Sequence, residues 1–212
     1  FGLYFTDAIF FRTKHDIDPS VDLSKRYIYM MKHQSFVDPI VGGIIENKTI
    51  ISVTGYTKWV PLIGINASFA GSPFVTYEPK NNRSKGTTQK MTNILKNDKT
   101  CTLTLFPEGQ RYFSDEIVLD QIKTGGFVVA RDVGIDIVPV YHNIMDRFDD
   151  TKMEYNFSND VYCVWGAPIK VQGKDIEQLK NEYFERMKDL HNTIVLLKSK
   201  DVIPNYYRKR IL

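Results

Sequence analysis

One histidine and one aspartate, five residues apart, could together transfer a proton. They are His33 and Asp38, in the stretch KHQSFVDP that ends at Pro39. In a regular helix an offset of five residues turns the chain about 140° away from the starting face, so the two side chains meet only across a turn. Pro39 favours the first helical position, which predicts that Asp38 is the N-cap of a helix and lies beside His33.

A histidine that a carboxylate holds in one tautomer is suited to act as a general base on a hydroxyl group. The alternative is that Asp38 only caps its helix and that His33 is a polar residue without a chemical role. The spacing alone does not separate the two.

The segment LFPEGQR (Leu105–Arg111) follows an apolar, β-branched strand. It is expected to form a loop at the carboxyl end of that strand, which is where α/β proteins bind ligands. Glu108 and Arg111 around Gly109 suit a site for an anion. An ordinary surface turn with an exposed ion pair is the alternative.

The segment KTGG (Lys123–Gly126) precedes a predicted helix. Backbone amides at a helix N-terminus, with Lys123 nearby, favour phosphate or carboxylate; the alternative is a glycine-rich loop that permits close packing. In IVPV (Ile137–Val140), Pro139 is disfavoured in a central strand, which predicts an edge strand or a bulge.

Short apolar runs alternate with helical stretches along the chain, which predicts an α/β fold with a mostly parallel central sheet flanked by helices. The expected strands are Tyr27–Lys32, Thr49–Thr54, Pro73–Tyr77, Thr100–Phe106, Ile135–His142 and Val161–Val164. The expected helices are Pro39–Ile45, Ser84–Lys96 and Gly126–Asp132.

A long C-terminal helix is the clearest single element. Apolar residues recur every three or four positions from Ile176 to Leu197 and form one stripe. Asp175 and Gln178 suit its N-terminus as a capping box. With no repeat and no linker in the sequence, we expect residues 1–212 to form one domain.

Composition narrows the function classes. The 28 Lys and Arg residues nearly balance the 25 Asp and Glu residues, and the positive excess lies in Lys198–Leu212, so nucleic acid is not an expected partner. The 4 histidines and 2 cysteines are too few and too scattered for a structural metal site, so none is expected. Cys101 and Cys163 stand among apolar or β-branched neighbours and are expected to be buried thiols in a reducing compartment.

The two ends of the chain carry membrane-related features. The apolar stretch Phe1–Phe11 is expected to be either the tail of a membrane anchor or signal, or an ordinary amphipathic segment. Tyr206–Leu212 combines two tyrosines with three basic residues, which suits an anionic lipid surface; a solvated tail is the alternative.

Taken together, KHQSFVDP, WVPLIG (Trp59–Gly64), LFPEGQR, KTGG and IVPV resemble the glycerolipid acyltransferase family in order and approximate spacing. The best-known members of that family are 1-acylglycerol-3-phosphate acyltransferases. The resemblance extends from about Tyr27 to about Asn143. It implies an α/β fold on one membrane leaflet and transfer of an acyl group from acyl-CoA, or from acyl carrier protein, to a lysophospholipid hydroxyl in phospholipid biosynthesis.

The resemblance also implies roles for residues. His33 corresponds to the catalytic base and Asp38 to its orienting partner. Glu108, Gly109 and Arg111 match the motif for the acceptor phosphate, with Gln110 where many members have threonine. We expect Lys123 to assist at the same site.

One family feature is displaced. Members place an arginine soon after a second motif, but Gly71–Tyr77 ends without one. Lys80 and Arg83, slightly later, are the candidates to replace it at the acceptor phosphate. No metal or cofactor beyond acyl-CoA as co-substrate is expected, and the active site is expected on the cytoplasmic side of a membrane. The alternative functions are a non-catalytic lipid-binding protein of the same fold and a lysophospholipid esterase.

Overall fold

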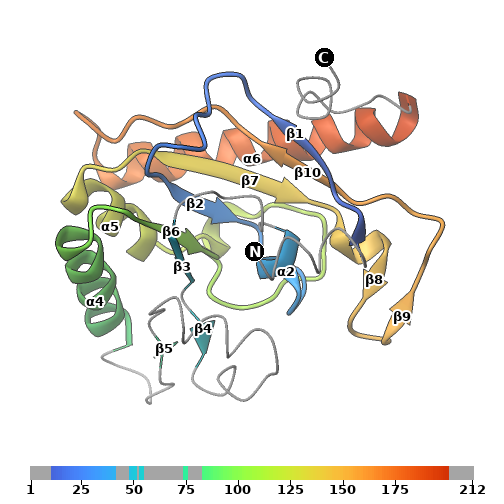
Figure 1. Cartoon of the computed structure of the whole chain (residues 1–212), viewed down its shortest axis with the longest axis horizontal. Coiled ribbons are helices and arrows are strands. Elements are labelled where there is room, and N and C mark those ends of the chain that lie inside the picture. The colour runs from blue at the N-terminus through green and yellow to red at the C-terminus, as the bar shows by residue number, and fades with distance from the viewer. Residues whose placement is uncertain (1–10, 42–47, 52, 55–73, 76–82, 201–212) are drawn as a thin grey trace.

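The computed structural model of the chain describes residues 11–41, 48–51, 53–54, 74–75 and 83–200 (Figure 1). Its centre is a six-stranded sheet with the strand order β1-β10-β7-β2-β6-β3. These strands are β1 (Lys14–Ile17), β2 (Ile28–Met31), β3 (Lys48–Ile51), β6 (Cys101–Leu105), β7 (Ile137–His142) and β10 (Tyr162–Trp165). The four neighbours β7, β2, β6 and β3 are mutually parallel, whereas β10 is antiparallel to β7 and parallel to β1. The predicted α/β fold with a mostly parallel sheet is confirmed.

The remaining elements are short strand pairs and helices. The pairs are β4 (Val53–Thr54) with β5 (Phe74–Val75), and β8 (Phe148–Asp149) with β9 (Glu154–Tyr155). The helices are α2 (Asp38–Val41), α4 (Arg83–Asn97), α5 (Gly125–Val133) and α6 (Ile176–Lys200), with 3₁₀ turns at Leu119–Gln121 and Ile144–Asp146. The strand expected at Thr49–Thr54 is therefore divided between two sheets, because β3 pairs with β6 and β4 pairs with β5.

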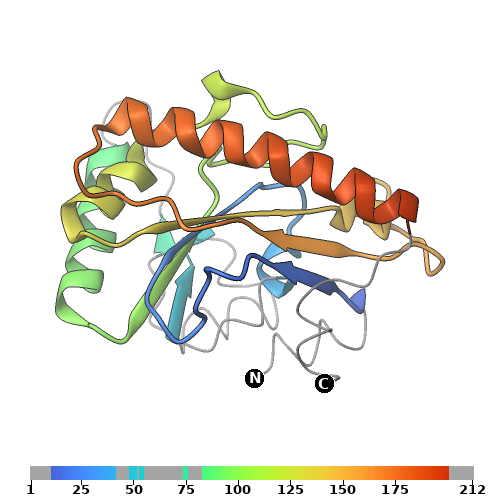
Figure 2. The same ribbon diagram turned by 90° about the horizontal axis from the view of Figure 1, so that it is seen from above.

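Alternate residues of the central strands pack into two separate apolar clusters, as a sheet buried on both faces requires. Ile28 and Met30 of β2 join the cluster that also contains buried residues of α4, α5 and α6. Tyr29 and Met31 of β2 join the second cluster, to which α2 contributes. Figure 2 shows α6 crossing one face of the sheet, with α2 on the opposite side.

Helix α6 confirms the predicted apolar stripe and cap. Leu179, Tyr183, Met187, Leu190, Ile194 and Leu197 are all buried. At the N-terminus, the Gln178 amide N–H donates to Asp175 Oδ1 at 2.8 Å, and the Asp175 amide N–H donates to Gln178 Oε1 at 2.9 Å. This is a reciprocal capping box, which satisfies amides that a helix start leaves without intrahelical partners.

Of the two alternatives predicted for Pro139, the edge strand is wrong, because β7 lies between β10 and β2, whereas a bulge does lie opposite Pro139. The backbone nitrogen and the carbonyl of Pro139 both point toward β10. The carbonyl accepts the Gly166 N–H at 2.9 Å, and the nitrogen has no hydrogen to donate. β10 ends at Trp165, and the next bridge joins Ile137 to Ile169. The three residues Gly166–Pro168 thus lie opposite only two, Val138 and Pro139. The hydrogen-bond ladder is irregular at this point, so the N–H that Pro139 lacks leaves no regular ladder bond unmade.

Cys101 and Cys163 are fully buried and form no disulfide, as expected. Within the described residues, the helices are all too short or too polar to cross a bilayer.

Candidate active site

The carboxyl ends of parallel strands β2, β6 and β7 meet at one edge of the sheet, beside α2 (Figure 1). His33 comes two residues after β2, Glu108 three residues after β6, and His142 is the last residue of β7. The loop after β6 is attached to the loop after β2, since the Tyr112 N–H donates to the His33 carbonyl at 2.8 Å. The topology therefore brings three separate segments together.

His33 and Asp38 meet as the sequence predicts. His33 Nδ1 lies 2.7 Å from Asp38 Oδ2. The His33 side chain is 21% exposed and the Asp38 side chain is fully buried. Since a carboxylate accepts, we assign the proton of this bond to Nδ1, which leaves the lone pair of Nε2 available for another donor. The His33 ring also stacks on Phe106, with centroids 4.4 Å apart.

Asp38 orients His33 without acting as the predicted N-cap. The helix begins at Asp38 itself, and the Ile40 N–H donates to the Val37 carbonyl instead. The Asp38 carboxylate points back along the chain, where Oδ2 accepts the Gln34 N–H at 2.8 Å and Oδ1 accepts the Ser35 N–H at 2.9 Å. These two amides and His33 together fix the carboxylate in place.

A second histidine, which sequence reasoning missed, faces the same carboxylate. His142 Nε2 lies 3.6 Å from Asp38 Oδ1, and both side chains are fully buried. Burial lowers the pKa of His142, so its ring is neutral at pH 7. The Ile144 N–H points to His142 Nδ1 at 3.5 Å, which assigns the ring proton to Nε2, on the side of Asp38. Because His142 is neutral, it does not compensate the negative charge of Asp38, and this charge can stabilise the protonated form of His33.

Glu108 lies beside the His33 loop in an environment that disfavours its charge. It is 8% exposed, and burial raises the pKa of its carboxyl to about 6, partly opposed by Lys32 and His33. Lys32 is itself buried and donates to the Glu116 carbonyl at 2.6 Å. Glu108 therefore contributes a carboxyl that changes protonation close to neutral pH.

We expect Glu108→Gln to alter the pH dependence of folding stability. Because the folded state raises the pKa of Glu108, its contribution is largest below the unfolded value and is lost as the pH rises through about 6. Between pH 4.5 and 7.5 the wild type should lose about 1.6 kcal/mol relative to Glu108→Gln. Urea unfolding of both proteins at these two pH values measures the difference. Parallel pH profiles would contradict the burial of an ionisable Glu108.

Gly109 and Lys123, which belong to two different sequence motifs, lie against each other in the structure. Gly109 has φ of +67°, and a Cβ at this position would lie 2.7 Å from Lys123 Nζ. The Lys123 N–H donates to the Pro107 carbonyl at 3.0 Å. The left-handed backbone favours glycine here, and a Cβ would require the Lys123 ammonium group to move. For Gly126, close packing is the better description, since a Cβ there would lie 2.9 Å from Leu105 and Met30 side-chain atoms.

Gly109→Ala should therefore displace the ammonium of Lys123 as well as strain the loop. We expect a loss of stability of about 1–2 kcal/mol from the left-handed backbone and weaker binding of inorganic phosphate. Gly134→Ala is the matched control, because Gly134 has φ of +71° and a Cβ added there would meet nothing within 4 Å. The control should lose similar stability with unchanged phosphate binding. Equal effects of both variants on phosphate binding would remove Lys123 from the site.

Arg111 is held by a residue that no sequence motif indicated. Its Nη1 donates to Asp150 Oδ2 at 2.8 Å, and the guanidinium lies over Phe113, 5.5 Å from the ring centroid. Asp150 lies in the turn between β8 and β9, 39 residues after Arg111. Asp150 reaches Arg111 only because the β8–β9 hairpin folds against the loop after β6.

Some predicted residues lie outside the described part of the chain. These are Lys80, the motif Trp59–Gly64, the N-terminal residues 1–10 and the tail Tyr206–Leu212. Arg83 is the first residue of α4, and nothing is described of its side chain. Their expected roles stay predictions.

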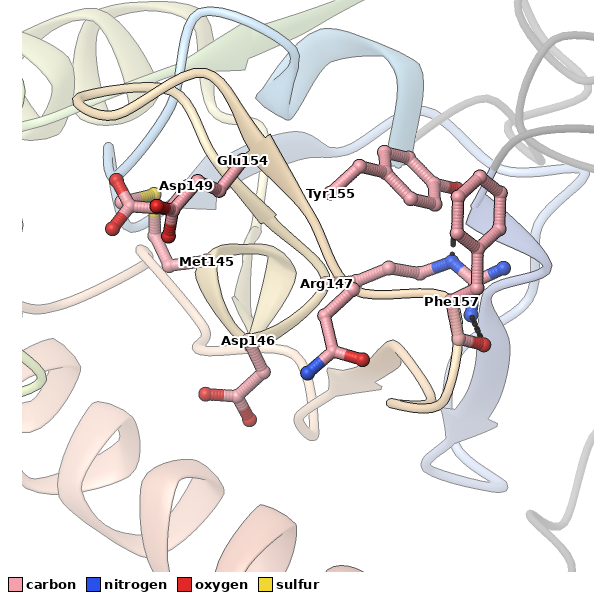
Figure 3. A pocket seen from close by; sticks show the side chains of 8 residues that line it. Met145, Asp146, Arg147, Asp149, Glu154, Tyr155 and Phe157 are labelled. Carbon is pink, nitrogen blue, oxygen red and sulfur yellow. Dashed lines mark hydrogen bonds between the residues drawn. The ribbon is translucent and has the colours of Figure 1, made fainter.

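A hollow lies at the β8–β9 hairpin, and His33 is not among the residues that line it. It has a volume of about 530 Å³ and is lined by Met145, Asp146, Arg147, Asp149, Glu154, Tyr155, Asn156 and Phe157 (Figure 3). Arg147 donates to Tyr155 Oη at 3.0 Å and to the carbonyls of Phe157 and Asn159. The Arg147 guanidinium thus joins β9 to the residues that follow it, through Tyr155, Phe157 and Asn159. Because its hydrogen bonds are made within the protein, we assign no ligand to the hollow.

No group of three or more potential metal-ligating side chains occurs in the described ranges. The chemistry that the described site can perform is proton transfer at His33, next to Arg111 and Lys123 as groups that attract an anion.

Comparisons with known proteins indicate the family and the fold. A family model described as "Acyltransferase" matches residues 9–143. The 1-acyl-sn-glycerol-3-phosphate acyltransferase of Saccharomyces cerevisiae is 29% identical over 117 residues, which are 55% of this chain and 38% of that protein. The match thus spans well under half of the relative's length.

A solved structure shares the fold. The 1-acyl-sn-glycerophosphate (LPA) acyltransferase PlsC of Thermotoga maritima superposes with a TM-score of 0.71, covering 86% of this chain and 73% of that one. The sequence identity is 16%, so this likeness establishes the architecture alone.

Proposed function

The chain belongs to the acyltransferase family, and from that premise we propose that it transfers a fatty acyl group to the free hydroxyl of a lysophospholipid. The proposed donor is acyl-CoA or acyl carrier protein, and the proposed acceptor is 1-acylglycerol 3-phosphate, as in phospholipid biosynthesis. The contact that carries the proposal is His33 Nδ1 against the buried Asp38 Oδ2 at 2.7 Å.

The reaction is a direct displacement. His33 Nε2 takes the proton of the acceptor hydroxyl as its oxygen attacks the thioester carbonyl carbon. Backbone amides stabilise the oxyanion of the tetrahedral intermediate. The C–S bond then breaks, and the thiolate of coenzyme A leaves with the proton that His33 returns. The mechanism has no acyl-enzyme, in keeping with the complete burial of Cys101 and Cys163.

The acceptor phosphate is assigned to the loop after β6. Arg111 and Lys123 supply positive charge there, and Gly109 permits the close approach of Lys123. Lys80 and Arg83 are the proposed further cations for a phosphate that carries up to two negative charges. Glu108 belongs to the same loop and is assigned to shaping it against His33.

We place the active site at the surface of a membrane, on its cytoplasmic side. What supports the membrane surface is that Phe36 is 41% exposed and Phe113 is 49% exposed, on the loops that carry His33 and Arg111; the cytoplasmic side is proposed from the family resemblance alone. Large exposed aromatic side chains next to a site commonly mark a surface for apolar partners.

A panel of lysolipids tests the proposal. The full chain is incubated with acyl-CoA and acceptors that differ only in headgroup, and the products are identified by mass spectrometry. We expect diacyl product with 1-acylglycerol 3-phosphate in preference to choline- or ethanolamine-bearing lysolipids. Transfer to the latter alone would refute the assigned acceptor, and release of free fatty acid alone would make the protein an esterase.

A further inference from the structure

One buried carboxylate connects the two loops of the site. The Asp150 side chain is fully buried, and its Oδ2 accepts three hydrogen bonds. The donors are Ser35 Oγ at 3.0 Å, the Phe36 N–H at 2.9 Å and Arg111 Nη1 at 2.8 Å. Asp150 lies beyond residues 9–143, which the family model matches, so nothing in that match assigns it a role.

The three donors come from two segments with different proposed roles. Ser35 and Phe36 stand between His33 and Asp38, whereas Arg111 belongs to the loop after β6. We propose that Asp150 is a positioning residue that holds Arg111 in register with the His33–Asp38 loop, so that a bound phosphate places the acceptor hydroxyl at His33. This inference rests on the proposed function and deepens it.

The physical basis is the freedom of the arginine side chain. Arg111 is 41% exposed, so without a partner it would sample many rotamers. Asp150 occupies Nη1 and leaves the other donors of the planar guanidinium for the two oxygens of a phosphate. A carboxylate that orients a binding group in this way reduces the entropy that the ligand must remove.

The substitution Asp150→Asn removes the negative charge of this side chain but keeps its size and one hydrogen-bond-accepting oxygen. The amide oxygen of asparagine can replace Oδ2 and still accept from Ser35 and Phe36. Its NH₂ group would then replace Oδ1, which has no hydrogen-bond partner among the described residues. Asp150→Asn therefore removes the charge that holds Arg111 while it keeps the hydrogen bonds of the loop.

The experiment is a double-mutant cycle read by calorimetric titration with sn-glycerol 3-phosphate, a water-soluble phosphomonoester, with glycerol as the neutral control. The proteins are the wild type, Asp150→Asn, Arg111→Ala and the double variant. Asp149→Asn is the matched control, because Asp149 is the neighbouring carboxylate and contacts Thr151 and Lys152 rather than the site. Thermal midpoints show whether each variant is folded.

We expect Asp150→Asn to weaken phosphate binding about tenfold in the presence of Arg111 and less than about twofold in Arg111→Ala. Asp149→Asn should leave binding within about twofold of the wild type. Ser35→Ala, which removes one donor to the same oxygen, is the second variant and should weaken binding about threefold.

Wild-type affinity in Asp150→Asn, or equal weakening in both backgrounds, would overturn the role of Asp150. If Asp150→Asn does not fold, wild-type phosphate affinity in Ser35→Ala would overturn the role of Asp150. A wild type that binds no phosphomonoester also refutes the inference. A wild type that shows the expected coupling but transfers no acyl group refutes the proposed function alone.

Discussion

Replacing His33 by alanine is expected to reduce acyl transfer by about a thousandfold or more, because the reaction loses its general base. The fold should persist, since the His33 ring is partly exposed and stacks at the edge of the sheet on Phe106. Initial rates with saturating acyl-CoA and acceptor measure the loss in kcat, and circular dichroism with a thermal midpoint verifies the fold.

His33→Gln is the companion variant. Its side-chain amide can still donate to Asp38, but it has no basic nitrogen. It should be as inactive as His33→Ala if His33 acts by removing a proton. Substantial transfer by either variant would end the assignment of His33 as the base.

Replacing Asp38 by asparagine should lower kcat by hundreds to thousands of fold. Each carboxylate oxygen of Asp38 accepts a backbone N–H, so the NH₂ group of asparagine must face a donor whichever way it is turned. If it faces His33, Nδ1 must become the acceptor, the proton moves to Nε2, and the base is lost. If it faces Ser35, two donors oppose each other and the loop is displaced.

The kinetic pattern distinguishes orientation from collapse of the site. An Asp38 that only orients His33 predicts a loss in kcat with little change in acceptor KM. The measurement is a full titration of both substrates, beside the unfolding free energy of the variant. A folded Asp38→Asn with a wild-type kcat would contradict the role assigned to this carboxylate.

The alternation of apolar residues predicted most of the fold because it reflects burial directly. All six expected strands and the long C-terminal helix have counterparts in the structure, although β4 and β5 belong to a separate sheet. Of the two alternatives predicted for Pro139, the bulge is present and the edge position is wrong, because a local rule on missing donors carries no information on the neighbouring strands. The irregularity that accommodates Pro139 lies at Gly166–Pro168, more than 25 residues away.

The site was predictable where its chemistry is local in sequence. His33 and Asp38 are separated by one turn, and Gly109 with Lys123 adjoin the same strand end, so motif and spacing were sufficient. Asp150 and His142 were not predictable, because each reaches the site through topology. Asp150 is supplied by a hairpin 115 residues after Ser35, and His142 by the parallel register of β7 with β2. An acidic residue in a hairpin turn carries no sign of such a contact.

The most direct test of the central claim is the stoichiometry of the reaction. The full chain is incubated with acyl-CoA and 1-acylglycerol 3-phosphate, and diacyl product, free coenzyme A and free fatty acid are quantified in parallel for the wild type and for His33→Ala. A general base that activates the acceptor hydroxyl predicts equal amounts of diacyl product and coenzyme A from the wild type, no fatty acid, and neither product above background from His33→Ala. Coenzyme A released with free fatty acid and no diacyl product, or equal transfer by both proteins, would contradict it.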